Sequence, residues 1–336
     1  MKRTQLIVLA GVLAAGPIAA AADRPQSAPS AASVKILRRE WTDTARKRIV
    51  PVKIYYPVAA ARPLPVIIFS HGLGGSREGY EYLGRYWAAH GYVSVHLQHK
   101  GSDTEVWKGK AEPLKAMRRA AADLRNATNR PLDVRFAIDR MEKMNRDETP
   151  LRGRLDLKAI GAAGHSFGAY TTLAVAGQDF SARPGRRLTL ADPRVKAAIA
   201  MSAPVPRQKD RRERAFASIT IPCLHMTGTR DKSLVGSTSA AERRIPFDAG
   251  RAPHQYLIVF AGGDHMIFSG RRFSRRPASR KSDARFHELI RRSSLAFWNA
   301  YLKKDAKAEA WLAGGGFEAL LGRDGTFEKR LKQTKP

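Results

Sequence analysis

Cysteine is almost absent from this chain, and acidic residues are scarce. The 336 residues include a single cysteine, Cys223, so no intramolecular disulfide can form and no cysteine cluster can hold zinc or an iron–sulfur centre. Asp and Glu number 30 against 60 Lys and Arg, which gives a formal net charge of +30. Helix-turn-helix, RNP-like and zinc-finger patterns are also missing, so we expect no nucleic-acid partner despite the charge.

Long apolar runs are missing too, apart from the N-terminus, where the pattern is that of a secretory signal. Lys2 and Arg3 precede an apolar stretch over 5–15, and small residues follow over 17–22. We therefore expect a signal peptide at 1–22, a flexible Pro-, Ser- and Ala-rich leader at 23–33, and a single domain at 34–336. The expected location is secreted or periplasmic, and the alternative is an uncleaved anchor.

The positive charge persists without the signal. Removing residues 1–22 takes away Lys2 and Arg3 and no acidic residue, which leaves +28. Such a surface is expected to adsorb to anionic membranes or polymers, with strong salt dependence. The alternative is that the charge reflects an arginine-rich composition on solvated faces.

Strand-like and helix-like segments alternate along the chain. Short apolar runs at 65–70, 92–97, 159–163, 195–201, 223–227 and 255–260 are typical of buried strands, and 34–56 is typical of an edge hairpin. Helical patterns lie between them, at 78–90, 113–129, 132–144, 167–176 and 283–302, and Pro131 is expected to divide the second from the third. The predicted fold class is α/β, with a mostly parallel central sheet covered by helices on both faces.

Four chemically suggestive features follow strands of this predicted sheet. They are the turn Gly164-His-Ser-Phe-Gly168, the loop His71-Gly-Leu-Gly-Gly75, Asp231 and His265. Because ligands bind at the carboxyl ends of parallel strands, all four are expected at one edge of the sheet. A serine turn without a function would not require this coincidence.

Ser166 is the candidate nucleophile. A serine hydroxyl needs a base to take its proton, and the base needs an acid to orient it. The G-x-S-x-G elbow and the chain order Ser166, Asp231, His265 fit this requirement. Asp264 is a rival acid, but it adjoins His265 in sequence and is expected to cap a turn instead.

Other histidines have simpler explanations. His225 lies within a predicted buried strand and is expected to be a core residue. His165 adjoins Ser166, but its side chain should point away from that of Ser166, which favours a structural role.

The tetrahedral intermediate also needs donors for its oxyanion. We expect the backbone N–H groups of Leu73 and Phe167 to supply them, because glycines around Leu73 let the backbone approach a substrate. His71 is expected to brace this loop, with substrate contact as the alternative. No metal and no organic cofactor are expected.

These motifs resemble those of α/β-hydrolases, over about residues 50–312. The run His71-Gly-Leu-Gly-Gly-Ser-Arg-Glu-Gly-Tyr80, the elbow and the segment Gly262-Gly-Asp-His-Met266 resemble bacterial predicted dienelactone hydrolases, a group similar to platelet-activating-factor acetylhydrolases. The resemblance implies an α/β-hydrolase fold and a serine esterase with Ser166 as nucleophile, Asp231 as acid and His265 as base. True dienelactone hydrolases use a cysteine nucleophile, which argues against dienelactone as substrate here. Secreted polyester hydrolases share the fold but usually carry a Trp-Ser-Met elbow and a disulfide.

Segments 98–130 and 203–216 are the expected walls of the substrate pocket. Trp107, Met117 and Phe216 are candidate lining residues, and each could equally be ordinary core. The absence of a long apolar lid favours short-acyl small-molecule esters, with a lipase, a phospholipid acetylhydrolase or a polyester hydrolase as alternatives. A different class remains open: a basic binding protein of the cell envelope that uses a hydrolase scaffold.

Overall fold

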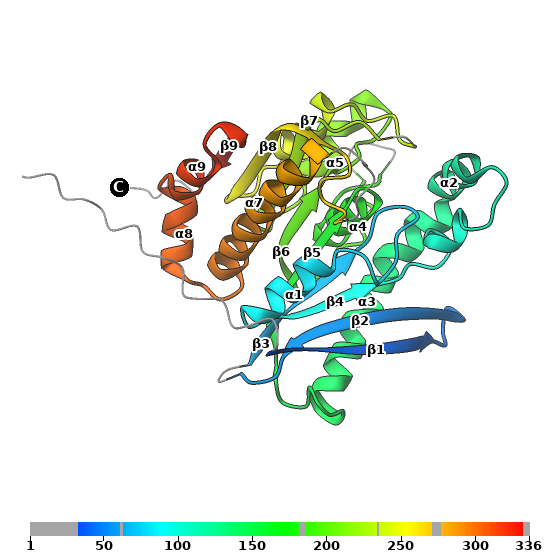
Figure 1. The fold of residues 1–336 in the computed structure, drawn as a ribbon. Coiled ribbons are helices and arrows are strands. Elements are labelled where there is room, and N and C mark those ends of the chain that lie inside the picture. Colours follow the sequence, from blue (N-terminus) through cyan, green and yellow to red (C-terminus); the bar gives the residue numbers. More distant parts are fainter. Residues whose placement is uncertain (1–32, 61–62, 182–185, 234, 271–276, 332–336) are drawn as a thin grey trace, which may run out of the picture.

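A nine-stranded sheet forms the centre of the protein (Figure 1). The computed structural model describes residues 33–60, 63–181, 186–233, 235–270 and 277–331. The predicted signal peptide, and all of the predicted leader except Ser33, lie outside the described residues. Within the described ranges, none of the helices is both long enough and apolar enough to cross a membrane.

The sheet is parallel in its middle and antiparallel at both edges. Its order is β1-β2-β4-β3-β5-β6-β7-β8-β9. The strands from β4 to β8 pair in parallel, whereas β1, β2 and β9 pair antiparallel to their neighbours. The strands are β1 (Val34–Asp43), β2 (Arg48–Pro57), β3 (Leu64–Ser70), β4 (Val93–Leu97), β5 (Leu155–His165), β6 (Val195–Met201), β7 (Cys223–Arg230), β8 (Gln255–Asp264) and β9 (Gly325–Arg330).

Helices cover both faces of the sheet. Side chains alternate between the two faces of a strand, so in β3 Ile67 and Phe69 pack with one group of helices while Val66 and Ile68 pack with another. The first group is α1 (Glu81–Ala89), α7 (Pro277–Tyr301), α8 (Ala306–Ala313) and α9 (Gly316–Leu321). The opposite face carries α3 (Leu124–Asp147), with α4 (Phe167–Ala176) and α5 (Arg212–Ala217) further along. The remaining helices are α2 (Pro113–Ala122) and α6 (Ile245–Ala249).

The predicted fold class is confirmed, and one helix boundary was wrong. Pro131 lies inside α3, and the break between α2 and α3 falls at Asp123. Asp123 adopts an extended conformation (φ −74°, ψ 110°), and its side chain accepts a hydrogen bond from the N–H of Arg125, which caps α3. A single proline removes only one backbone hydrogen bond, and packing against the sheet sustains the helix through it. Strand β9 and helices α5, α6, α8 and α9 were not expected from the sequence.

Candidate active site

The turn around Ser166 joins β5 directly to α4. Ser166 has φ 56° and ψ −116°, a conformation with positive φ that is strained for a residue with a side chain. The glycines beside it are required by close packing, because a Cβ on Gly164 would lie 2.3 Å from the carbonyl oxygen of Gly168. A Cβ on Gly168 would come still closer to the carbonyl oxygen of Ser70 in β3. The tight turn therefore presents Ser166 at the carboxyl edge of the sheet.

The three side chains predicted to form a triad lie in one hydrogen-bonded line. Nε2 of His265 is 3.0 Å from Oγ of Ser166, and Nδ1 of His265 is 2.7 Å from Oδ1 of Asp231. Strands β7 and β8 run longer than the sequence indicated, so Asp231 and His265 each come directly after a strand. Asp231 is fully buried, whereas 13% of the His265 side chain is exposed. The exposed end of the line is therefore at the serine and histidine.

Asp231 has three side-chain partners besides His265. Its Oδ2 accepts hydrogen bonds from the hydroxyls of Ser202 and of Thr227, the latter at 2.9 Å, and its Oδ1 lies 2.8 Å from Nε of Arg243. Burial raises the pKa of this carboxyl, but the hydrogen bond from His265 and the charge of Arg243 outweigh that effect, so the pKa is lowered. Asp231 is thus held as a carboxylate. Ser202 directly follows β6, so the strand-edge argument could have found it, whereas nothing in the sequence marks Arg243.

The rival residues have structural roles, as predicted. Asp264 accepts a hydrogen bond from the N–H of Met266 at 2.8 Å, which is a turn cap. His225 is buried 3.2 Å from the side chain of Gln255. His165 is buried with Nδ1 2.8 Å from the hydroxyl of Tyr80, and its ring centroid lies 4.7 Å from that of His265. Burial lowers the pKa of His165 well below its usual value, so it packs against His265 as a neutral ring.

The loop 71–75 lies against the elbow. A Cβ on Gly72 would be 3.2 Å from Nδ1 of His165, and Gly74 has a positive φ of 72°. Among the described residues, the N–H groups of Gly74 and Gly75 have backbone acceptors, but that of Leu73 has none. Phe167 is the first residue of α4, where N–H groups point out of the helix end. These positions suit the two predicted oxyanion donors.

The candidate pocket residues fall into three environments. His71 is 1% exposed, with Nδ1 2.6 Å from the carbonyl oxygen of Gly72, so it braces its own loop. Trp107 donates from Nε1 to the carbonyl oxygen of Gly74 at 2.8 Å, and a Cβ on Gly74 would lie 3.3 Å from Cε of Met117. Trp107 and Met117 therefore lie beside the loop of Leu73.

Phe216 is not a pocket residue and takes the alternative given for it, that of ordinary core. It is 0% exposed and packs with residues of α4, β6 and β7 in a closed core cluster. A side chain fully enclosed in this way cannot line an open pocket. The sequence left both positions open, because the side of the short helix α5 that faces the sheet is set by packing.

Comparison with known proteins gives one consistent similarity. Residues 34–125 match the model of the family described as platelet-activating factor acetylhydrolase, isoform II. The chain is 27% identical over 162 residues to the platelet-activating factor acetylhydrolase of Cavia porcellus, covering 40% of this chain and 37% of that protein. It is 26% identical over 157 residues to the enzyme of that name from Canis lupus familiaris, covering 38% and 35%.

These matches bear on the fold and on part of the site. The alignments span little more than a third of the length of either relative. The family match includes the loop 71–75 and ends before Ser166. The chain has the α/β-hydrolase fold and is similar to platelet-activating factor acetylhydrolases, which confirms that part of the predicted resemblance.

Proposed function

We propose that this protein is a serine carboxylester hydrolase that cleaves short-acyl esters through an acyl-enzyme intermediate. The single observation that carries the proposal is the position of His265, whose two ring nitrogens lie 3.0 Å from Oγ of Ser166 and 2.7 Å from Oδ1 of Asp231. A base placed between an acid and a hydroxyl is the arrangement that activates a serine.

The proposed reaction follows from the hydrogen bonds. The carboxylate of Asp231 accepts the Nδ1–H of His265, which leaves the lone pair of Nε2 facing Ser166. Nε2 takes the hydroxyl proton as Oγ forms a bond to the ester carbonyl carbon. Collapse of the tetrahedral intermediate breaks the ester C–O bond, and the leaving alcohol takes the proton from Nε2. Water then attacks the acyl group by the same steps in reverse, which releases the acid and restores Ser166.

The oxyanion is proposed to bind the N–H groups of Leu73 and Phe167. Both lie at the carboxyl edge of the sheet, Leu73 in the loop after β3 and Phe167 at the start of α4, just after β5. Fixed donors aimed at a developing charge are usually the largest single contribution to such catalysis, and loss of one costs about 10²–10³ in rate.

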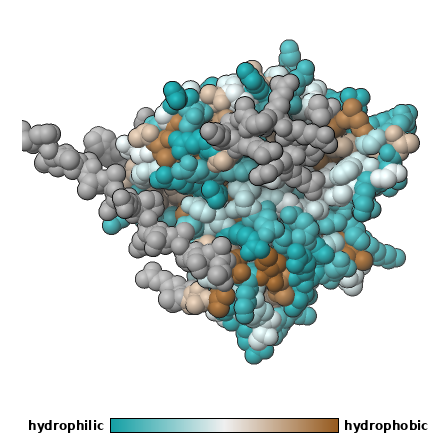
Figure 2. Space-filling view, viewed as in Figure 1, coloured by the Kyte–Doolittle hydropathy of each residue, from teal (hydrophilic) through white to brown (hydrophobic). Residues whose placement is uncertain are grey.

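Lipid or polymer esters are the second candidate substrate class, and α2 favours them over purely soluble esters. None of the residues of α2 is buried; Leu114 in its first turn is 42% exposed, and Leu124, which begins α3 just beyond it, is 80% exposed. The helix stands at the edge of the molecule in Figure 1 and is linked to the loop of Leu73 through Met117. On the face drawn in Figure 2, however, hydrophobic residues form only small separate groups, which favours the short-acyl class.

The test is a chain-length series of p-nitrophenyl esters from acetate to palmitate. We expect turnover to peak at two to four carbons in wild type and to vanish in Ser166→Ala, with an unchanged melting temperature. Ser218→Ala is the matched control, because the hydroxyl that it removes donates to the carbonyl oxygen of Gly177 and not to a residue of the proposed triad. Activity of Ser166→Ala above a tenth of wild type contradicts the proposal. A peak at long chains selects the lipid class.

Absence of turnover at every chain length would favour the other class, a basic envelope-binding protein on a hydrolase scaffold. Such a binding function would depend on the positive charge of the surface. It would not need the hydrogen-bonded line of Ser166, His265 and Asp231. We also propose export, on the strength of the sequence at 1–22; sequencing the N-terminus of the protein recovered from cells checks this.

A further inference from the structure

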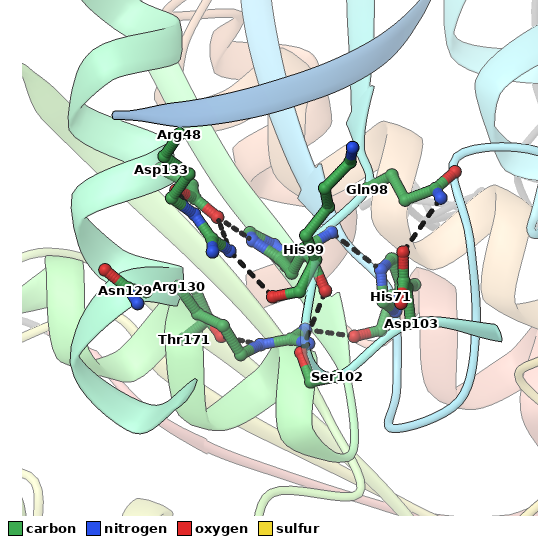
Figure 3. A network of polar contacts seen from close by, with 12 residues as sticks. Arg48, His71, Gln98, His99, Ser102, Asp103, Asn129, Arg130, Asp133 and Thr171 are labelled. Carbon is green, nitrogen blue, oxygen red and sulfur yellow. Dashed lines mark hydrogen bonds and ion pairs between the residues drawn. The ribbon is translucent and has the colours of Figure 1, made fainter. Parts of the chain in front are cut away.

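Arg130 of α3 is completely buried beneath the proposed oxyanion loop. Its guanidinium donates three hydrogen bonds to three different segments: to the carbonyl oxygen of His71, to Oγ of Ser102 at 2.8 Å and to Oγ1 of Thr171 at 2.9 Å. Figure 3 shows the side chain reaching from α3 to all three. It thereby joins the loop after β3, the loop after β4 and helix α4.

Arg130 contacts residues close to both proposed oxyanion donors, Leu73 and Phe167. The carbonyl oxygen of Ser102 accepts the N–H of Gly74 at 2.9 Å, so Arg130 fixes the chain on both sides of Leu73, through His71 and through Ser102. On the other donor, Cζ of Arg130 lies 4.6 Å from the ring centroid of Phe167. The hydroxyl of Thr171 in turn donates to the carbonyl oxygen of Phe167 at 2.9 Å.

Arg130 also leaves a positive charge under the loop. Among the described residues no carboxylate forms an ion pair with it, so its three hydrogen-bond acceptors are neutral. Burial lowers its pKa to about 9, and the charge of Asp133 opposes that change, so the group stays protonated at neutral pH. Burying a cation without a carboxylate beside it costs stability. A neutral side chain could fill the same space without that cost, so the charge of Arg130 points to a role beyond packing.

A second hydrogen-bonded line holds the loop from its other side. Oγ of Ser70 lies 3.0 Å from Nε2 of His99, and Nδ1 of His99 lies 3.0 Å from Oδ2 of Asp133. The backbone N–H of His99 donates to Nε2 of His71 at 3.1 Å, which fixes the orientation of that ring. Arg48 pairs with Asp133 at 2.8 Å.

This line has the connectivity of a Ser-His-Asp triad but not its access. Ser70 is 1% exposed, and His99 and Asp133 are 0% exposed, so no ester can reach the hydroxyl. Burial, together with the charge of Arg130, lowers the pKa of His99 to about 3, and the ring is neutral at physiological pH. Its contribution is to fix the end of β3 and the ring of His71.

We infer that Arg130 is a positioning residue for the oxyanion hole, which aligns Leu73 and Phe167 by holding His71, Ser102 and Thr171. The inference rests on the proposed function and adds to it a residue that touches no substrate. Its consequence is specific: loss of Arg130 impairs stabilisation of the tetrahedral intermediate and leaves binding of the ester in its ground state nearly unchanged.

The experiment compares Arg130→Met and Arg130→Lys with a control, Arg154→Met. Arg154 also donates to backbone carbonyl oxygens, those of Pro57, Val58 and Pro150, but it precedes β5 at the opposite edge of the sheet. With p-nitrophenyl acetate we expect Arg130→Met to lower kcat about 10²-fold, as loss of one oxyanion donor does, with KM changed by less than about threefold. Arg130→Lys should fall between this variant and wild type, because it keeps the charge but not the fork of donors.

A second readout separates positioning from general damage. Affinity for an aryl trifluoromethyl ketone, which forms a tetrahedral adduct with a serine, should weaken in Arg130→Met by the same factor as kcat, and not at all in Arg154→Met. A folded Arg130→Met with the kcat of Arg154→Met, or with a change in KM alone, overturns the inference. If Arg130→Met does not fold, Thr171→Val decides: about tenfold lower kcat at constant KM is expected, and wild-type kcat overturns it.

Failure of the proposed function would be seen separately, as absence of ester turnover in wild type. In that event hydrogen–deuterium exchange over residues 71–75 still tests the positioning role. Exchange should be faster in Arg130→Met than in wild type and Arg154→Met, and equal rates in all three overturn the inference.

Discussion

Ser202 donates its hydroxyl to the oxygen of Asp231 that His265 does not use. His265 lies 2.7 Å from Oδ1, whereas Ser202 and Thr227 both donate to Oδ2. Ser202 itself has a positive φ of 55° at the end of β6. Hydroxyls from the end of β6 and from β7 thus hold one carboxylate oxygen, and the other oxygen faces His265 and Nε of Arg243.

Removing this hydroxyl is expected to weaken catalysis without affecting substrate binding. In Ser202→Ala, Oδ2 keeps only Thr227, so the pKa of Asp231 rises and His265 is less firmly oriented. We expect kcat for p-nitrophenyl acetate to fall about tenfold, equivalent to about 1.4 kcal/mol of activation free energy, at constant KM. Steady-state kinetics measure this. Thr227→Val, which removes the other donor to Oδ2, should act similarly, and wild-type kcat in both variants would show that Oδ2 needs no donors.

Gly168 is expected to tolerate no side chain. A Cβ there would overlap the carbonyl oxygen of Ser70 in β3, and the other nearest atoms are also backbone, of Ser70 and His71, which cannot move aside as a side chain can. Gly168→Ala should therefore lose about 2 kcal/mol or more of unfolding free energy, within the range for overpacked cores. Urea unfolding provides the value. Gly79→Ala is the control, because the nearest atom to its Cβ is 3.5 Å away; equal stability of the two variants would contradict the close packing of the elbow on β3.

Stability is expected to fall as the pH drops below 6.5. Burial lowers the pKa of His96 to about 3, of His99 to about 3 and of His225 to about 4, from an ordinary value of 6.5. The unfolded chain binds protons on these rings below pH 6.5 and the folded chain does not. Each ring therefore removes about 1.4 kcal/mol of unfolding free energy per pH unit between 6.5 and its folded pKa.

Urea midpoints between pH 4.5 and 7.5 measure this slope. His225→Gln removes one of these rings and should therefore reduce the slope by about 1.4 kcal/mol per pH unit. The carboxyl of Asp231 acts in a lower window: its lowered pKa contributes stability above its ordinary value of 3.8, which is lost only as the pH falls below that value. Constant stability from pH 6.5 to 4.5 would show that the histidines titrate normally.

The net charge of +30 is expected to bind the protein to anionic surfaces in low salt. Phosphatidylglycerol vesicles should retain it at about 0.02 M NaCl and release it at about 0.5 M, because the Debye length shrinks over this range. Turnover of a neutral ester should change less than about twofold over the same range. Sedimentation with vesicles measures binding, with phosphatidylcholine as control. Retention at high salt would point to apolar contacts, such as those available on α2, instead of charge.

Local patterns in the sequence determined most of the fold. Runs of β-branched residues such as 65–70 mark strands that are buried on both faces, and their alternation with helical patterns gives a parallel sheet. The edge strand β9 was missed because its residues are mixed in polarity and its place depends on pairing with β8. The helix break predicted at Pro131 was wrong for a related reason. The helix propensity of proline is low, but packing of α3 on the sheet outweighs the one lost hydrogen bond.

The candidate triad could be predicted from the sequence because the carboxyl ends of parallel strands lie at one edge of the sheet. Ser166, Asp231 and His265 each follow a strand, so topology alone brings them together. The arginines that hold these residues and the oxyanion loop in place could not be predicted. Arg130 and Arg243 lie on helical segments far from any motif, and they resemble the many other arginines of this basic chain. Only the tertiary structure shows which arginines are buried and which atoms they join, because burial and hydrogen bonding depend on how distant segments pack and not on the residues beside them.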